Sequence, residues 1–185
     1  LNKALSILFL KKIETLNLII YEKLVSYYLG IFGGVGTNPS AALLKGKKII
    51  AFAEEERFNR IKNSTGELPI NSIFYCLKEA NISINNVKNI SFGWECNRQF
   101  KVVPKKLKKI HNEFKNLKNK FNLNLEERIR LRYDPDRIFN ELKWAFAKRK
   151  QKLNQKIIYC DHHLSHAAST FYPSGFKKSS ILVLD

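Results

Sequence analysis

The order of apolar runs and helical repeats predicts an α/β domain built on a mixed sheet. Three strand-like runs with tight connections come first, over residues 28–34 and 40–56, and strand-like and helical segments alternate after them. Tight connections favour antiparallel pairing, whereas strand–helix–strand alternation favours parallel pairing. The 185 residues suffice for one domain with a sizeable core, or for one lobe of a larger protein. We therefore predict a five-stranded mixed sheet with flanking helices.

The first half of the chain supplies most of this sheet. Residues 1–27 carry apolar side chains at spacings of three and four, which predicts an amphipathic leader helix of uncertain role. Residues 28–34 (YLGIFGG) predict a strand that ends in glycines, and residues 40–56 predict two strands joined by a turn. A helix is expected over residues 68–81, where Pro69 stands near its start, and another strand over residues 87–94.

The second half begins with a basic region and ends with a cluster of histidines. Residues 105–121 and 136–153 have helical spacing and many Lys and Arg residues, which predicts a basic helical insertion over about residues 101–155. The segment KIIYC, residues 156–160, predicts the fifth strand, which runs into a cluster of histidines and a short helix. The apolar run SSILVLD, residues 179–185, predicts one more strand.

Composition excludes several classes of protein. Hydrophobic residues make up 44% and charged residues 26%, which is typical of a globular chain rather than a disordered one. The apolar stretch from Ala4 to Leu10 is too short to span a bilayer, so we expect no membrane span. The three cysteines are far apart and form no disulfide framework, which favours a reducing, cytoplasmic location.

The net charge of +17 raises an alternative function, a non-catalytic basic module that binds nucleic acid or a partner protein. Residues 101–156 hold 18 Lys or Arg against 6 Asp or Glu, a net +12. The whole sequence is also rich in Lys, Asn and Ile, so part of this charge reflects composition. Nucleic-acid binding is therefore the less favoured interpretation.

Three of the four histidines lie within the segment DHHLSHAAS. If the chain turns helical here, His162 and His166 lie one turn apart on one face and can hold one metal ion, while His163 and His166 form a second candidate pair. Asp161 is placed to accept an imidazole N–H. Asp185, at the end of an apolar strand, is a candidate third ligand. The alternative is a polar helix start whose histidines bond to the backbone.

At this point the sequence resembles a known family. The stretches DHHLSHAASTFYPSGF, ILVLD and NPSAALLKGKKIIAFAEEERFNRIKN resemble motifs of the carbamoyltransferases that modify nodulation factors and antibiotics. The resemblance covers about residues 28–100 and 156–185. It implies the first lobe of a sugar kinase and actin-like (ribonuclease H-like) fold, related to the tRNA threonylcarbamoyladenosine enzyme. Residues 28–178 would form that lobe and residues 179–185 the first strand of a truncated second lobe, which makes the chain an amino-terminal fragment.

The resemblance also implies a reaction and its cofactors. Carbamoyl phosphate and ATP give carbamoyl adenylate, and the carbamoyl group is then transferred to the hydroxyl of a small-molecule or sugar acceptor. It implies a divalent metal, Fe²⁺ with Mg²⁺ or Mn²⁺ as alternatives, held by His162, His166 and Asp185. It places Lys62 where the family has a lysine that contacts substrate or the carbamoyl group. ATP chemistry would require the missing carboxyl-terminal portion, in the same chain or as a partner, so we expect this chain alone to be inactive.

Three positions depart from the family motifs. Thr37 and Asn38 stand where the family has His-Asp, and Asn63 stands where it has a second His. Two further features are ambiguous at this level. The glycines at residues 33–36 fit either an anion-binding turn or a plain corner, and the EEERF segment fits either a substrate site or a charged strand end whose Arg57 and Arg60 make structural ion pairs.

Overall fold

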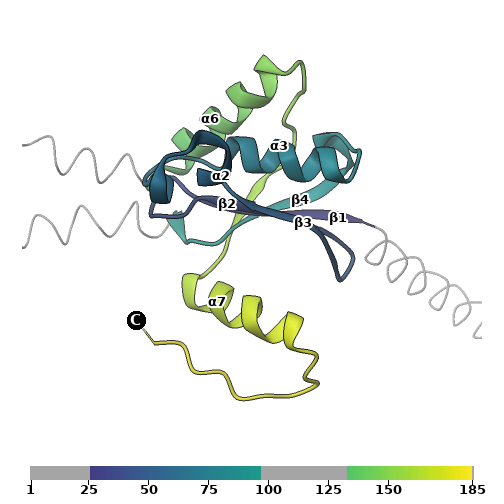
Figure 1. The fold of residues 1–185 in the computed structure, drawn as a ribbon, viewed down its shortest axis with the longest axis vertical. Helices are drawn as coiled ribbons and strands as arrows, with labels where there is room; N and C mark the ends of the chain where they lie inside the picture. The colour runs from purple at the N-terminus through teal and green to yellow at the C-terminus, as the bar shows by residue number, and fades with distance from the viewer. Residues whose placement is uncertain (1–25, 97–132, 185) are drawn as a thin grey trace, which may run out of the picture.

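The computed structural model describes residues 26–96 and 133–184. Its centre is a five-stranded sheet in the order β3-β2-β1-β4-β5 (Figure 1). The strands are β1 Tyr27–Phe32, β2 Ser40–Lys45, β3 Lys48–Glu54, β4 Val87–Phe92 and β5 Ile157–Tyr159. The predicted five-stranded mixed sheet is thereby confirmed.

Strand direction changes across the sheet as the connections predict. β1 pairs antiparallel with β2, and β2 with β3, through short turns. β1 pairs parallel with β4, and β4 with β5, through connections that contain helices. The carboxyl ends of β1, β4 and β5 consequently meet at one edge of the sheet.

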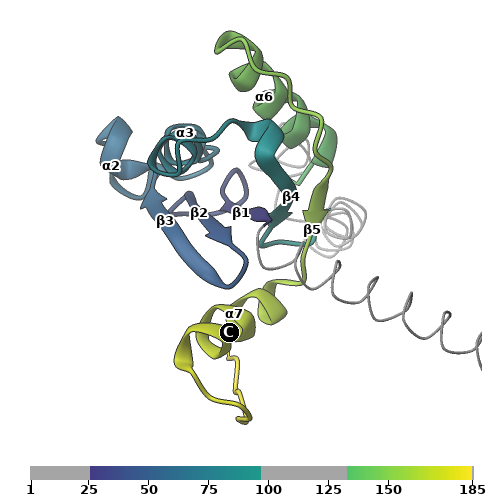
Figure 2. The same ribbon diagram turned by 90° about the vertical axis from the view of Figure 1, so that its right-hand side faces the viewer.

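Helices lie on both sides of this sheet. α3 (Ile70–Glu79) and α6 (Pro135–Lys148) cover one face, and α7 (His162–Phe171) lies on the opposite side below the strands (Figures 1 and 2). The short helix α2 (Glu56–Asn59) follows β3. Alternate strand residues point toward α3 and α6 and form the core with apolar side chains of both helices. This core includes Leu29, Ile31, Leu43, Ile90, Phe92, Ile73, Leu77, Ile138, Leu142 and Phe146.

The capping of α3 explains Glu55, the second residue of the EEERF segment. Glu55 is 2% exposed, and its carboxylate accepts hydrogen bonds from the backbone N–H groups of Asn71 and Ser72 at 3.0 and 2.9 Å. These amides belong to the first turn of the helix, which has no intrahelical acceptor for them. A carboxylate at a helix amino terminus also interacts favourably with the helix dipole. Glu55 is therefore a structural residue that joins β3 to α3.

Several predicted boundaries change in the structure. The helix expected over residues 136–153 ends at Lys148, yet Leu153 beyond it is still buried against the core. The strand expected over residues 87–94 ends at Phe92. Residues 179–184 have no regular secondary structure, so their role as a strand of a second lobe stays a prediction. The leader helix and the helix at 105–121 lie outside the described residues. Across the described ranges, no helix is both long and apolar enough to cross a membrane.

Candidate metal centre at the carboxyl ends of the parallel strands

The histidine cluster lies where the three parallel strands end. Backbone hydrogen bonds join the chain just beyond them, from Gly93 N to Ile31 O at 3.1 Å and from Cys160 N to Phe92 O at 2.8 Å. The chain leaves β5 and enters α7 within two residues of this junction. The structure therefore places the histidines at the carboxyl ends of the parallel strands.

Asp161 caps the amino terminus of α7. Its Oδ1 accepts a hydrogen bond from Leu164 N at 2.8 Å, which makes it the amino-terminal cap of the helix. Ser165 strengthens the same turn, because its hydroxyl donates to Asp161 O at 2.8 Å. The backbone amides in the first helical turn have no intrahelical acceptor, and Asp161 supplies one. This contact uses only Oδ1, so the expectation that Asp161 also accepts an imidazole N–H stays a prediction.

The structure brings His162 and His166 together. Their Nε2 atoms are 3.1 Å apart, and His162 Nδ1 lies 3.3 Å from the carbonyl oxygen of Gly93. A carbonyl only accepts hydrogen bonds, so Nδ1 of His162 carries the proton and donates it to Gly93. In the neutral ring this leaves a lone pair on Nε2, which faces His166.

Aromatic side chains enclose the ring of His162 on the side of the sheet. The Trp94 ring centroid lies 4.1 Å from that of His162, and the Phe32 ring centroid lies 6.5 Å from it. Phe32 is the last residue of β1, and Trp94 follows the end of β4 by two residues. His162 is half-buried against these rings, whereas His166 is exposed.

This pair of imidazoles fits a divalent metal ion. Metal–nitrogen bonds to histidine are about 2.0–2.1 Å for zinc, so nitrogens 3.1 Å apart can occupy neighbouring positions on one ion. The backbone carbonyl at Nδ1 is the usual partner that fixes a ligating histidine. Among residues 26–96 and 133–184, no cluster of three or more His, Cys, Asp or Glu side chains could complete such a site. Asp185, the predicted third ligand, lies outside the described residues.

Lys62 lies in a second loop, in a 3-10 turn Lys62–Ser64 that is bound to the loop after β1. Asn38 N donates to Asn63 O at 2.8 Å, and Gly66 N donates to Gly36 O at 2.9 Å. Lys62 is exposed. The structure thus places the turn that carries Lys62 against the loop that carries Asn38.

Comparison with known proteins places the chain in a family. Residues 33–185 match the family model of the carbamoyltransferase N-terminus. The chain belongs to the carbamoyltransferase N-terminal family. It is 32% identical to the nodulation protein NolNO of Sinorhizobium fredii over 79% of this chain and 19% of that protein. It is also 32% identical to an uncharacterized protein of Synechocystis sp., over 80% of this chain and 23% of that protein. The chain therefore spans about a fifth of the length of these two relatives.

A shorter match joins the carbamoyltransferase N-terminal chain to a third protein. An uncharacterized 19.2 kDa protein of Rhizobium etli is 42% identical over 55 residues, which is 30% of this chain and 32% of that protein.

The positions that depart from the carbamoyltransferase motifs lie together in space. Asn38 and Asn63 are joined by a backbone hydrogen bond, and both have left-handed backbone angles, with φ of 56° and 62°. Asn, Asp and His are the side chains other than glycine that tolerate this conformation best. Asparagine therefore suits the backbone of both turns, and its carboxamide cannot ionise, unlike the Asp and His that the resemblance leads us to expect there.

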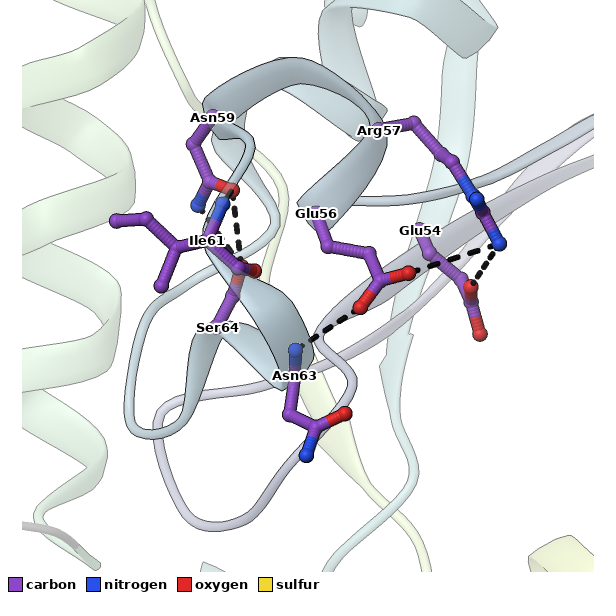
Figure 3. Close-up of polar contacts among 7 residues, drawn as sticks. All are labelled: Glu54, Glu56, Arg57, Asn59, Ile61, Asn63 and Ser64. Atoms are coloured by element: carbon purple, nitrogen blue, oxygen red, sulfur yellow. Dashed lines mark hydrogen bonds and ion pairs between the residues drawn. The ribbon is translucent and has the colours of Figure 1, made fainter.

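The loop that carries Lys62 is braced by the segment before it (Figure 3). Glu56 Oε2 accepts from Asn63 N at 2.9 Å. The Asn59 carboxamide accepts from Ile61 N at 2.9 Å and donates to Ser64 Oγ at 2.9 Å. These contacts give Glu56 and Asn59 roles that spacing alone did not reveal, because they depend on how the chain doubles back.

The two ambiguous motifs have structural explanations. Arg57 lies 3.5 Å from Glu54 and 3.6 Å from Glu56, which supports the ion-pair interpretation for Arg57. Gly34 N donates to Glu67 O, so this amide is already engaged. A side chain at Gly33 would place its Cβ 2.6 Å from Glu67 O. The glycines therefore allow two loops to pack closely, as in the corner alternative.

None of the cysteines is activated for nucleophilic chemistry. Burial raises the pKa of the Cys76 thiol to about 11 and that of the Cys96 thiol to about 12. Burial also raises the pKa of Cys160, which is only partly buried. All three are free thiols, in agreement with the absence of a disulfide framework in the sequence. A cysteine nucleophile needs a lowered pKa, so thiol catalysis is not supported.

Proposed function

We propose that this chain is the amino-terminal part of an O-carbamoyltransferase. The complete enzyme would transfer a carbamoyl group from carbamoyl phosphate, by way of carbamoyl adenylate, to the hydroxyl of a small-molecule or sugar acceptor. The observation that carries the proposal is the convergence of the His162 and His166 Nε2 atoms, 3.1 Å apart, in a chain of the carbamoyltransferase N-terminal family. We further propose a cytoplasmic location for this soluble biosynthetic activity.

The proposed fold is the first lobe of an actin-like, ribonuclease H-like domain. The strand order β3-β2-β1-β4-β5 supports it, with the first three strands antiparallel and β4 and β5 parallel to β1. In open sheets of this kind, ligands bind beyond the carboxyl ends of the parallel strands, which is where His162 lies. The second lobe would then close over α7.

His162, His166 and Asp185 would hold the metal ion. Two imidazoles and one carboxylate with remaining open positions form a donor set typical of non-haem Fe²⁺, which supports iron over Mg²⁺. When bound, the ion would neutralise phosphate charge and polarise the carbamoyl carbonyl. The chain's own contribution is to fix the two rings, through the Gly93 carbonyl at His162 Nδ1 and the helical spacing of His166.

Transfer requires the acceptor oxygen to bond to the carbamoyl carbon while the bond from that carbon to the adenylate oxygen breaks. The hydroxyl proton must pass to a base, and AMP leaves. Lys62 is exposed on its braced turn and would contact the substrate or the carbamoyl group as a cation. Asn38 and Asn63 cannot accept that proton as a carboxylate or an imidazole would, so we expect slow transfer with this pair.

The test combines residues 1–185 with the carboxyl-terminal portion of a related carbamoyltransferase, supplied as a second chain with ATP, carbamoyl phosphate and Fe²⁺. Mass spectrometry would search for carbamoylated products among sugars and aminoglycosides. We expect product with the second chain, none without it, and at least a tenfold loss in the His166→Ala variant, about the lower end of ligand-shell effects. Thr37→His with Asn38→Asp should raise the rate. Product formed without the second chain, or unaffected by His166→Ala, would contradict the proposal.

A further inference from the structure

Among the Phe, Tyr and Trp side chains that the structure describes, Trp94 packs most closely on His162. Their ring centroids are 4.1 Å apart with an interplanar angle of 48°. Trp94 is half-buried and packs against the hydrophobic core. The chain has two tryptophans, and the other, Trp144, is 62% exposed on α6. The two indoles thus differ in whether they touch the histidine pair.

Trp94 is itself held in place by other rings. The Tyr133 ring centroid lies 6.4 Å from that of Trp94 with an interplanar angle of 30°, and the Phe32 ring centroid lies 6.3 Å from it. Tyr133 precedes α6, and Phe32 ends β1. These contacts hold the indole between the end of β1 and the residue before α6, and the imidazole of His162 packs against this fixed ring.

Two contacts restrain the His162 ring. The ring packs against Trp94, and its Nδ1 lies 3.3 Å from the Gly93 carbonyl oxygen. The atom left to bind a ligand, Nε2, points at His166. Without these two contacts, the side chain of a histidine in the first turn of an exposed helix would be free to rotate and would lose rotamer freedom when it binds a metal ion. Ordering one such side chain costs enough to change an affinity about two- to tenfold.

We propose that Trp94 is a positioning residue, which holds His162 in the rotamer that the metal ion requires. This inference rests on the proposed metal role of the His162–His166 pair. It concerns the indole ring rather than the ligands themselves. Removing the ring should weaken metal binding while the two imidazoles remain, and restoring a flat ring of smaller size should recover most of the affinity.

Affinity of the 185-residue chain for Ni²⁺, measured by titration calorimetry, provides the first test, since imidazole suits this ion. We expect Trp94→Leu to weaken binding about five- to tenfold, and Trp94→Phe to stay within about threefold of the native chain. Trp144→Leu is the matched control and should leave the affinity unchanged. Circular dichroism of each variant checks that it folds.

Tryptophan fluorescence tests independently whether the ion binds beside the Trp94 indole. Paramagnetic Ni²⁺ bound beside His162 should quench Trp94, so the Trp144→Phe variant, which keeps only Trp94, should lose most of its emission at saturation. The Trp94→Phe variant, which keeps only Trp144, should show little quenching. The quenching in Trp144→Phe should follow the calorimetric saturation curve.

The outcomes separate this inference from the proposed metal site. Equal Ni²⁺ affinity in the native chain and in a His162→Ala, His166→Ala double variant would overturn both. Binding that needs the histidines but is the same in folded Trp94→Leu would overturn the positioning role alone. If Trp94→Leu does not fold, the Trp144→Phe variant decides, because an unquenched Trp94 at saturating Ni²⁺ would mean that the indole does not adjoin the ion.

Discussion

Replacing Glu55 with Gln should destabilise the domain far more than the same change at its neighbour Glu54. The Glu55 side chain is buried, and its two oxygens accept four hydrogen bonds. Oε1 accepts from Asn71 N and Nδ2 at 3.0 and 2.7 Å, and Oε2 accepts from Ser72 N and Oγ at 2.9 and 2.9 Å. Glutamine keeps the size of this side chain but exchanges one acceptor oxygen for a donor NH₂ group.

The expected loss follows from these contacts. Two of the four bonds lose their acceptor, and hydrogen bonds to a charged group are worth about 1.5–3 kcal/mol each. The negative charge at the amino terminus of α3 contributes up to about 2 kcal/mol more in a partly buried site. Because Ser72 is fully buried, water cannot replace the missing partner. We expect the free energy of unfolding to fall by about 3–5 kcal/mol, a large share of the ~5–15 kcal/mol typical of a domain.

Urea unfolding followed by circular dichroism measures this loss directly. Glu54→Gln is the matched control, since Glu54 makes a surface ion pair with Arg57 at 3.5 Å and such pairs contribute about 0–1 kcal/mol. The melting temperature of Glu55→Gln should fall by about 10 °C, while that of Glu54→Gln should change little. A Glu55→Gln variant within about 1 kcal/mol of the native chain would refute the capping argument.

Two further predictions concern packing and pH. Gly33→Ala should destabilise the domain by about 2–3 kcal/mol, because the new Cβ would lie 2.6 Å from Glu67 O. Gly66→Ala should cost only about 1 kcal/mol, since its strain comes from the positive φ alone, and equal losses in urea unfolding would contradict the contact argument. Thiols in the unfolded chain ionise near pH 9.0, whereas the pKa values of Cys76 and Cys96 in the folded chain are about 11 and about 12. The unfolded state therefore releases these protons at lower pH than the folded state. The free energy of unfolding should fall as pH rises above 9.0. A Cys76→Ala, Cys96→Ala double variant should show a smaller alkaline loss in the same assay, and an unchanged slope would exclude the thiols as its source.

Local patterns were sufficient to predict the sheet. In β1 and β2, side chains point alternately to the core and away from it. The resulting period of two residues is visible in the sequence. The pairing of His162 with His166 was predictable for the same reason, since a helix brings residues four apart together. The end of α6 was less predictable, because Leu153 continues the apolar pattern from an extended segment.

Features that depend on distant parts of the chain were not predictable from spacing. Glu55 lies in a charged run, which suggests that its side chain is exposed to solvent. It is buried instead, because the backbone amides at the start of α3, 16 residues later, bind its carboxylate. The contact of Trp94 with His162 likewise requires β4 and β5 to lie side by side.

The central claim is that His162 and His166 are metal ligands in a carbamoyltransferase lobe, and anaerobic equilibrium dialysis with Fe²⁺ tests it most directly. His163 lies on the same helix turn and serves as the matched control position. We expect His162→Ala and His166→Ala each to lower Fe²⁺ affinity at least about tenfold, and His163→Ala to stay within about threefold of the native chain. If all three variants bind Fe²⁺ as the native chain does, or if His163→Ala weakens binding as much as His166→Ala, the proposed ligand pair is contradicted.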